Sequence, residues 1–159
     1  MSTLSFCWVG KTKAPYAVEG VAEYVGRITR YHECRVVVVP EERQDGRYSK
    51  RHRLEREGRR ILSHIGQLEP AWVAVLDAGG TSMSSREFAR MIRRACFEDT
   101  RSVVFVVGGP DGLSYAVRER ADHVVSLSQL TVPHDMARLL LAEQVYRAMT
   151  IIRGHPYNR

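Results

Sequence analysis

The feature that most constrains the fold of this chain is the run Val-Val-Phe-Val-Val at residues 103–107, which stops at Gly-Gly-Pro-Asp-Gly, residues 108–112. Five consecutive strand-forming residues without a charge are typical of a strand covered on both faces, as the strands of parallel sheets are. Glycine and proline directly after the run mark the end of the strand. We therefore expect a buried strand of a parallel sheet here.

The rest of the sequence alternates between short apolar runs and helical periodicity. Strands are expected at residues 4–9, 35–39, 72–76, 103–107 and 123–127, and helices begin near residues 15, 50, 85, 114 and 134. Residues 77–83 and 128–133 are expected to be loops. Ser84 and Glu87 have the spacing of a capping box for a helix that ends near Phe97. This alternation predicts an α/β fold, with a mostly parallel sheet and helices on both faces.

Length and composition place the chain among soluble globular proteins. Its 159 residues fit one domain, residues 1–159. The longest apolar runs are far shorter than the roughly 18 residues that a membrane-spanning helix needs, so we expect no contact with a membrane. The N-terminal segment has neither the basic start nor the long apolar stretch of a secretion signal, which predicts a cytoplasmic protein.

The cysteines and histidines do not form a metal-binding pattern. Cys7, Cys34 and Cys96 are odd in number and widely spaced, which argues against a disulfide framework and against a Cys-x-x-Cys metal site. The six histidines show no paired spacing either. We expect no bound metal, and three reduced cysteines in the core.

Positive charge is concentrated in one segment, residues 43–60. It holds eight of the 24 lysines and arginines but only three acidic residues, in a chain of net charge +6. Such a cluster is typical of proteins that bind a polyanion such as RNA, and Arg51 and Arg53 are then candidate phosphate contacts. A solvated basic helix without a partner explains the same charges equally well.

Three segments that together mix glycine, serine, threonine and apolar residues lie at the ends of predicted strands, at residues 76–83, 108–114 and 127–133. The carboxyl ends of parallel strands lie at one edge of a sheet, where open α/β sheets bind their ligands. Glycines there let a ligand approach the backbone, although a tight turn would use the same residues. The mixture of backbone polar groups and apolar side chains favours an adenosine-like ligand over a metal.

The last predicted helix is apolar around nearly its whole circumference over residues 136–152. A helix of this kind is buried on several sides, either at the centre of one domain or between two subunits, and we favour a homodimer. Glu143 and Arg147 have the i,i+4 spacing of a helix-surface ion pair. The tail beyond the helix contains His155, Tyr157 and Arg159, which could donate protons or stabilise negative charge, or could simply be frayed.

The order and content of several segments resemble the RlmH family, the bacterial 23S rRNA pseudouridine N3-methyltransferases of the SPOUT class. These segments are VVGGPDGL at 106–113, SLSQLTVPH at 126–134, EQVYRA at 143–148 and HPY at 155–157, preceded by VGK at 9–11. The resemblance covers nearly the whole chain. It implies a trefoil-knotted α/β fold, a homodimer and S-adenosylmethionine as cofactor.

The resemblance also implies roles for particular residues. Those expected to bind the cofactor are Leu76, Gly108, Leu127, Ser128, Gln129, Leu130, Thr131 and Val132. The catalytic candidates are Arg147, His155, Tyr157 and Arg159, and His134 and Arg138 are expected to contact the RNA together with Arg51 and Arg53. The chain departs from the family at Asn158, where histidine is frequent, and at Thr81, where lysine is frequent. The first departure leaves His155 or Tyr157 as the proton acceptor.

The expected function is therefore methyl transfer from S-adenosylmethionine to N3 of a pseudouridine in 23S rRNA, on the assembled ribosome. Two alternatives remain open from the sequence. The chain could be a noncatalytic RNA-binding protein that uses the basic segment 43–60, or a SPOUT methyltransferase that acts on another RNA base. Cofactor binding separates the first alternative from the enzyme.

Overall fold

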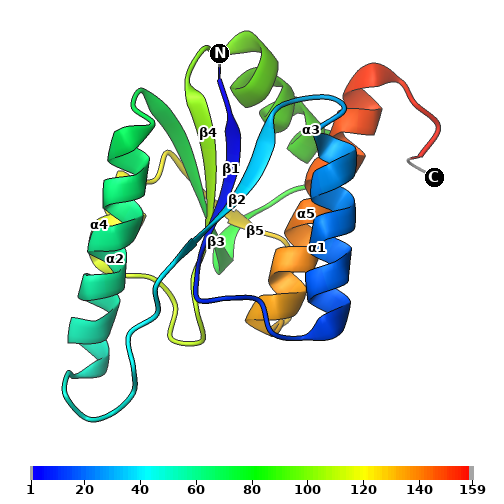
Figure 1. Ribbon diagram of the computed structural model, residues 1–159. Helices are drawn as coiled ribbons and strands as arrows, with labels where there is room; N and C mark the ends of the chain where they lie inside the picture. Colours follow the sequence, from blue (N-terminus) through cyan, green and yellow to red (C-terminus); the bar gives the residue numbers. More distant parts are fainter. Residues whose placement is uncertain (1, 158–159) are drawn as a thin grey trace.

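A computed structural model describes residues 2–157 and shows one parallel sheet with helices on both faces (Figure 1). The strands are β1 (Leu4–Val9), β2 (Cys34–Val39), β3 (Ala71–Ser82), β4 (Ser102–Val107) and β5 (His123–Ser126), in the spatial order β2-β1-β4-β3-β5. The helices are α1 (Pro15–Ile28), α2 (Lys50–Gln67), α3 (Ser85–Arg93), α4 (Tyr115–Arg120) and α5 (His134–Arg153), with a π-helical turn, η1 (Arg94–Glu98), after α3. All strand pairs are parallel, so the predicted α/β fold with a parallel sheet and helices on both faces is confirmed.

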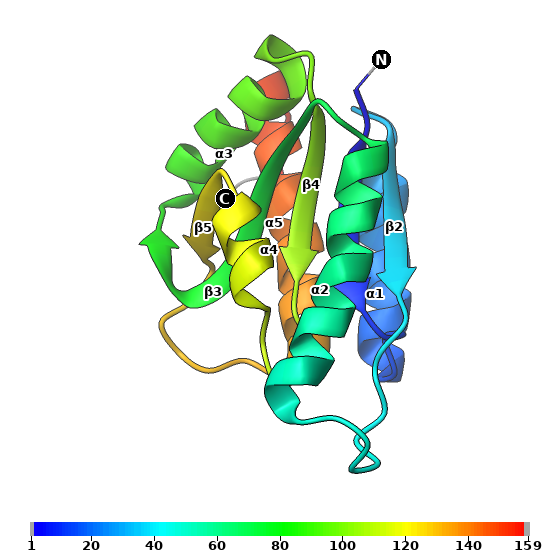
Figure 2. The ribbon, with the colours of Figure 1, turned by 90° about the vertical axis from the view of Figure 1, so that its left-hand side faces the viewer.

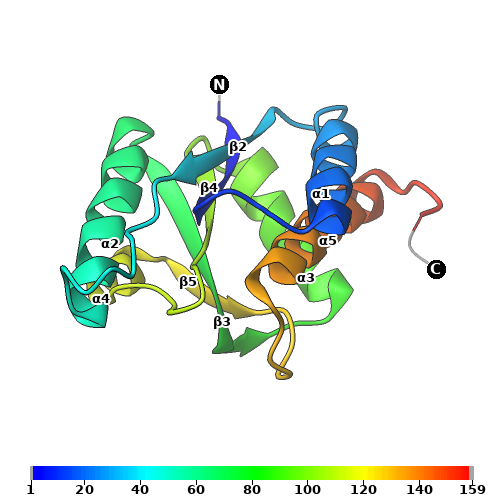
Figure 3. The same ribbon diagram turned by 60° about the horizontal axis from the view of Figure 1, so that its bottom comes forward.

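The helices form two layers, with α1, α3 and α5 on one face of the sheet and α2 and α4 on the other (Figure 3). Side chains alternate between these faces along each strand. Phe6 and Phe105 are paired in the sheet and belong to the core under α1, α3 and α5. Cys7 and Val104 point to the core under α2 and α4. The run at 103–107 is buried along its whole length, as its composition predicts.

Strand β3 is longer than the sequence indicated, because residues 77–82 continue the strand instead of forming a free loop. Its pairing with β5 shifts register between Leu76 and Thr81, and Thr81 then lies opposite Val125. Gly80 sits in this irregular stretch, where a Cβ atom would lie 2.7 Å from the carbonyl oxygen of Val124. The expectation of a loop at residues 77–82 was wrong. Glycine at position 80 lets the backbone of β3 approach β5 closely, so the strand continues.

Helix α3 starts as predicted and ends earlier. The Ser84 hydroxyl accepts a hydrogen bond from the Glu87 N–H, and the Glu87 carboxylate accepts one from the Ser84 N–H, so the capping box is confirmed. The α-helix ends at Arg93 instead of near Phe97, and the π-helical turn η1 covers the remaining residues. No helix of residues 2–157 has the length and apolarity that crossing a membrane requires.

The apolar helix α5 is buried between its neighbours within one chain. It packs on the sheet and lies between α1 and α3 (Figure 1). Leu141, Val145 and Met149 are fully buried, whereas Met136 near its start is exposed. Helices α1 and α3 therefore give α5 much of its cover within one chain, while Leu139, Leu140 and Ile151 remain partly exposed. The homodimer stays a prediction.

Arg138, expected to contact RNA, is instead completely buried in α5. Its guanidinium donates to the carbonyl oxygens of Val9 at 2.7 Å and Gly10 at 2.9 Å, and to Thr12 Oγ1 at 3.0 Å. It also lies over the Trp8 ring, 5.1 Å from the centroid. Arg138 therefore joins α5 to the end of β1 and has no surface for RNA. Burial lowers its pKa, and Asp135 partly opposes that effect.

Replacing Arg138 with methionine should cost about 3 kcal/mol of unfolding free energy or more, because buried acceptors at the end of β1 lose their donor. Urea unfolding of Arg138→Met, with Arg30→Met as a matched exposed control, measures this. A variant with wild-type stability and weakened RNA binding would instead return Arg138 to the RNA-contacting role.

Candidate functional site

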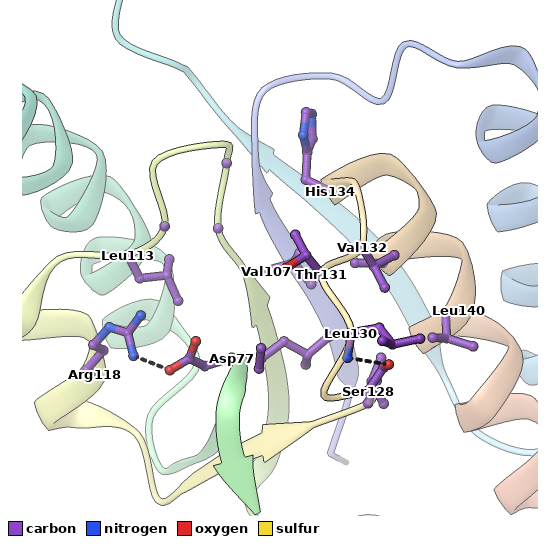
Figure 4. Close-up of a pocket in the computed structure, with 17 residues that line it drawn as sticks. Asp77, Val107, Leu113, Arg118, Ser128, Leu130, Thr131, Val132, His134 and Leu140 are labelled. Carbon is purple, nitrogen blue, oxygen red and sulfur yellow. Dashed lines mark hydrogen bonds and ion pairs between the residues drawn. The ribbon is translucent and has the colours of Figure 1, made fainter. Parts of the chain in front are cut away.

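A cavity of about 230 Å³ lies at the carboxyl edge of the sheet, where two loops and part of β3 meet the start of α5 (Figure 4). The loops follow β4 and β5, and Leu76, Asp77 and Ala78 belong to β3, so the predicted convergence of the three segments is confirmed although one of them is a strand. Seven of the eight residues expected to bind the cofactor line the cavity, namely Leu76, Gly108, Leu127, Ser128, Leu130, Thr131 and Val132. Gln129 is not among the lining residues, and His134, expected at the RNA, lies in the cavity wall.

The loop after β4 is compact because its backbone folds onto itself. Gly112 N–H donates to the Gly109 carbonyl oxygen at 3.0 Å. A Cβ atom on Gly108 would lie 2.6 Å from the Gly112 oxygen, so glycine at 108 is required by the loop's own backbone. A Cβ atom on Gly109 would enter open space. Gly109 is thus the position at which a side chain can be added to the cavity lining without distorting the loop.

The loop after β5 is held by two hydroxyl groups. The Ser126 hydroxyl donates to the Ser128 carbonyl oxygen, and the Ser128 hydroxyl accepts from the Leu130 N–H, both at 3.0 Å. These bonds fix the backbone of the loop while the Leu130 side chain stays 78% exposed at the cavity (Figure 4). An exposed leucine beside backbone polar groups suits a ligand with both a flat apolar part and hydrogen-bonding edges.

Sequence reasoning missed an ion pair in the cavity wall, between Asp77 and Arg118. Arg118 Nη1 donates to Asp77 Oδ2 at 2.8 Å (Figure 4). This hydrogen bond holds the pKa of Asp77 below its ordinary value, in spite of partial desolvation. The carboxylate is therefore ionised at neutral pH. The sequence signal that could have revealed this ion pair was Asp77, an acidic residue directly after the apolar strand run at 72–76.

A second cluster forms where the C-terminal tail folds back on the end of α5. The Tyr157 hydroxyl donates to Glu143 Oε2 at 2.8 Å, and Arg147 Nη2 donates to the same oxygen at 2.9 Å. The Arg147 guanidinium lies 4.9 Å from the centroid of the Tyr157 ring. The ion pair predicted for Glu143 and Arg147 is confirmed, and Tyr157 joins it.

Two properties of this cluster decide its chemistry. Desolvation, followed by hydrogen bonds with Tyr24 and Glu143, raises the pKa of Tyr157 well above its ordinary value. The hydrogen bond to Glu143 raises the pKa of Arg147. Tyr157 is thus a neutral hydrogen-bond donor at physiological pH and Arg147 a fixed cation, so Tyr157 is poorly suited to accept a proton.

His155 is exposed in the same tail, and its Nδ1 lies 2.6 Å from the Tyr31 hydroxyl on the segment after α1. The two rings are also in contact, with centroids 5.6 Å apart. The tail is therefore attached to the domain at Tyr31 as well as at Glu143. Arg159 and Asn158 lie outside the described residues.

The tail cluster and the cavity involve different stretches of α5 within one chain. His134, Ala137 and Leu140 of α5 line the cavity, whereas Arg147, His155 and Tyr157 are not among its lining residues. Ala137 and Arg147 are separated by about 15 Å along the helix axis, at 1.5 Å per residue (Figure 1). One chain alone does not bring its predicted catalytic residues to its predicted cofactor site.

The two arginines of the basic segment 43–60 that were expected to contact RNA differ in how exposed their side chains are. The Arg51 side chain is 91% exposed and lies 3.1 Å from Glu55. The Arg53 side chain is only 16% exposed, because it donates to the Tyr48 carbonyl oxygen and lies 3.5 Å from Asp111. Arg51 thus remains a candidate phosphate contact, whereas Arg53 supports the loop after β4. Within residues 2–157, no group of three or more histidine, cysteine or acidic side chains is placed to hold a metal ion.

Comparison with known proteins agrees with this geometry. Residues 2–158 match the family described as "Predicted SPOUT methyltransferase". The chain is 42% identical over 152 residues to a protein of Syntrophobacter fumaroxidans, with 96% of each chain covered. It is 40% identical over 154 residues to one of Listeria monocytogenes, with 95% of this chain and 96% of the relative covered. Both relatives are named ribosomal RNA large subunit methyltransferase H.

Solved structures share the fold at low sequence identity. A probable methyltransferase of Bordetella pertussis superimposes with a TM-score of 0.55 at 21% identity, covering 93% of this chain and 96% of that one. A probable methylase family protein of Haemophilus influenzae gives a TM-score of 0.57 at 10% identity, covering 99% and 71%. On the sequence match and the relatives together, the chain belongs to the SPOUT methyltransferase family and, within it, to the RlmH family that its motifs indicated.

Proposed function

We propose that this protein transfers a methyl group from S-adenosylmethionine to N3 of a pseudouridine in 23S rRNA, on the assembled ribosome. The observation that supports the proposal best is the cavity at the carboxyl edge, because most of its lining comes from two segments that resemble the family, 106–113 and 126–134, in a chain that matches the family over residues 2–158. The name of the relatives, ribosomal RNA large subunit methyltransferase H, supports rRNA as the substrate.

The residues of the cavity fit this cofactor chemically. Leu76, Leu127 and Leu140 offer an apolar wall for an adenine ring, and the backbone around Gly109 and Thr131 can hydrogen-bond its edges. The ionised Asp77 can accept hydrogen bonds from ribose hydroxyls or balance a positive charge. When bound, S-adenosylmethionine supplies an electrophilic methyl group on a positively charged sulfur.

The tail cluster has the groups that the other half of the reaction needs. Loss of the N3 proton leaves negative charge on the ring and the carbonyl oxygens of the target base. Arg147 as a cation and Tyr157 as a neutral donor can stabilise that charge, most effectively in a site screened from water. Glu143 holds both side chains at one oxygen and thereby sets their relative position.

We further propose a homodimer in which the tail of each subunit completes the cavity of the other. The exposed apolar residues Tyr16, Val18 and Met136 lie at the starts of α1 and α5, while Tyr157 of the tail is bound farther along α5, at Glu143. An antiparallel, two-fold pairing of these helices would bring one subunit's tail to the other's cavity. The trefoil knot expected for the family is part of the same proposal.

Calorimetric titration with S-adenosylmethionine should detect one site per chain, and Gly109→Val should weaken it at least tenfold because the added methyl groups occupy cavity space. Gly66→Val, another glycine whose Cβ atom would enter open space, is the matched control outside the cavity. Wild-type affinity in a folded Gly109→Val protein would place the cofactor elsewhere, and no binding by the wild type would favour the noncatalytic alternative.

Incubation with labelled cofactor should methylate ribosomes in preference to free rRNA, and nucleoside analysis should identify N3-methylpseudouridine. Tyr157→Phe should lower the single-turnover rate by roughly 10², as loss of one donor to developing charge does. Because the pKa of Tyr157 is raised, its hydroxyl stays protonated over the assayed range, so the pH dependence of the rate should keep its shape in this variant. An altered pH profile would make Tyr157 the base, and another methylated nucleoside would support the second alternative.

Mixing two inactive variants tests the composite site. Gly109→Val keeps an intact tail and Tyr157→Phe keeps an intact cavity, so a mixed dimer has one complete site. Co-expression should restore about a quarter of wild-type activity, since about half of randomly formed dimers are mixed and each has one working site of two. No recovery from a mixture that contains verified mixed dimers would mean that each site belongs to one chain, and sedimentation as a monomer at micromolar concentration would exclude the dimer.

A further inference from the structure

A second, larger hollow of about 540 Å³ lies on the opposite helical layer, between α2 and the start of α4. These two helices lie side by side on the face away from α5 (Figure 2). We refer to this hollow as the α2/α4 groove. Both helices begin at the carboxyl edge of the sheet, and Leu113 lines both the groove and the cofactor cavity. The groove is therefore a neighbour of the cavity but has its own walls.

The floor of the groove is largely apolar and forms where two elements approach closely. Gly58 of α2 faces Ser114, and a Cβ atom at position 58 would clash with the Ser114 hydroxyl. Leu54, Leu62 and Leu113 add apolar side chains to the lining. The hollow has a size within the range of small-ligand pockets.

The rim of the groove combines cations with an exposed aromatic ring. Lys50, Arg51 and Arg59 line it, and its acidic member, Glu55, is already paired with Arg51. Arg59 is exposed and makes no ion pair or side-chain hydrogen bond with any residue from 2 to 157. Tyr115 is 76% exposed at the first position of α4.

We propose that the α2/α4 groove binds a single-stranded segment of RNA, with one unstacked base against Tyr115 and the leucine walls and the adjoining phosphates at Arg59 and Lys50. Proteins that bind single strands combine a positively charged groove with aromatic side chains on which bases stack. The bases of a duplex are stacked inside it and cannot enter such a slot. An acidic peptide would use the cations but not the exposed ring.

The identification of RNA as the partner rests on the proposed function. The apolar floor and the cationic rim are observed independently of that function. The groove would give the enzyme a second binding contact with its RNA substrate, at a distance from the reacting base. Such contacts contribute to binding and orientation, and they leave the chemical step to the cavity and the tail.

The test is fluorescence anisotropy with a labelled single-stranded 12-nucleotide RNA of mixed sequence, in the absence of cofactor. Tyr115→Ala should weaken binding about tenfold, the effect of losing one stacked base, and Tyr115→Phe should bind within about twofold of wild type. Arg59→Gln should weaken binding and lower the slope of log affinity against log salt by about 0.7. Arg93→Gln, an exposed arginine on α3 across the sheet, is the matched control and should leave both unchanged.

Wild-type RNA affinity in both Tyr115→Ala and Arg59→Gln would overturn the proposal, as would equal weakening by Arg93→Gln. Equal loss of duplex and single-strand binding in Tyr115→Ala would also contradict a stacked base, and so would an acidic peptide that binds the groove in competition with RNA. Because no methyl transfer is measured, the outcome is independent of the proposed activity. If the protein is inactive but its RNA binding depends on Tyr115, the groove proposal stands and the proposed activity is wrong. If the protein is active but binds RNA equally well without Tyr115, the proposed activity stands and the groove proposal is wrong.

Discussion

The arrangement of the carboxyl edge depends on the buried guanidinium of Arg138. Parallel strands end with carbonyl groups that the sheet no longer satisfies, and the chain must then turn away into a helix. Arg138 donates to two such carbonyls, at Val9 and Gly10, across 128 and more positions of sequence. Asp135, one turn earlier, accepts from the N–H groups of Lys13 and Ala14. Together they fix the start of α5 against the end of β1, and the cavity at the carboxyl edge is built on that start.

Because α5 is anchored in this way, it places different chemistry along its length. Its first turns line the cavity, and Glu143 and Arg147, farther along the helix, bind the tail. The helix fixes a rise of about 15 Å between Ala137 in the cavity wall and Arg147 in the cluster. Contacts with Tyr31 and with α5 hold His155 and Tyr157 of the tail against the domain, so these residues are not frayed.

The sequence was informative where local pattern decides the structure. The uncharged run at 103–107, the capping box at Ser84 and the turn at Gly-Gly-Pro-Asp-Gly, residues 108–112, all depend on neighbours in sequence, and each lies where expected. The continuation of β3 past Leu76 could not be seen, because its partner Val125 is distant and the register shifts. The RNA-contacting role that the resemblance implied for Arg138 was wrong, and the sequence could not show it because the partners of Arg138 at Val9, Gly10 and Thr12 are distant in sequence.

The close contact between α2 and the start of α4 restricts position 58 to glycine. Glycine in the interior of a helix costs about 1 kcal/mol relative to alanine, and α2 also contains Gly66. Alanine at 58 would improve the intrinsic helicity of α2 and at the same time drive it away from Ser114, the residue that caps α4. Helix α2 thus gives up part of its own propensity for a close contact, so that its conformation depends on tertiary packing. A peptide of residues 50–67 taken alone would be expected to lose much of its helix, and with it the alignment of its arginines.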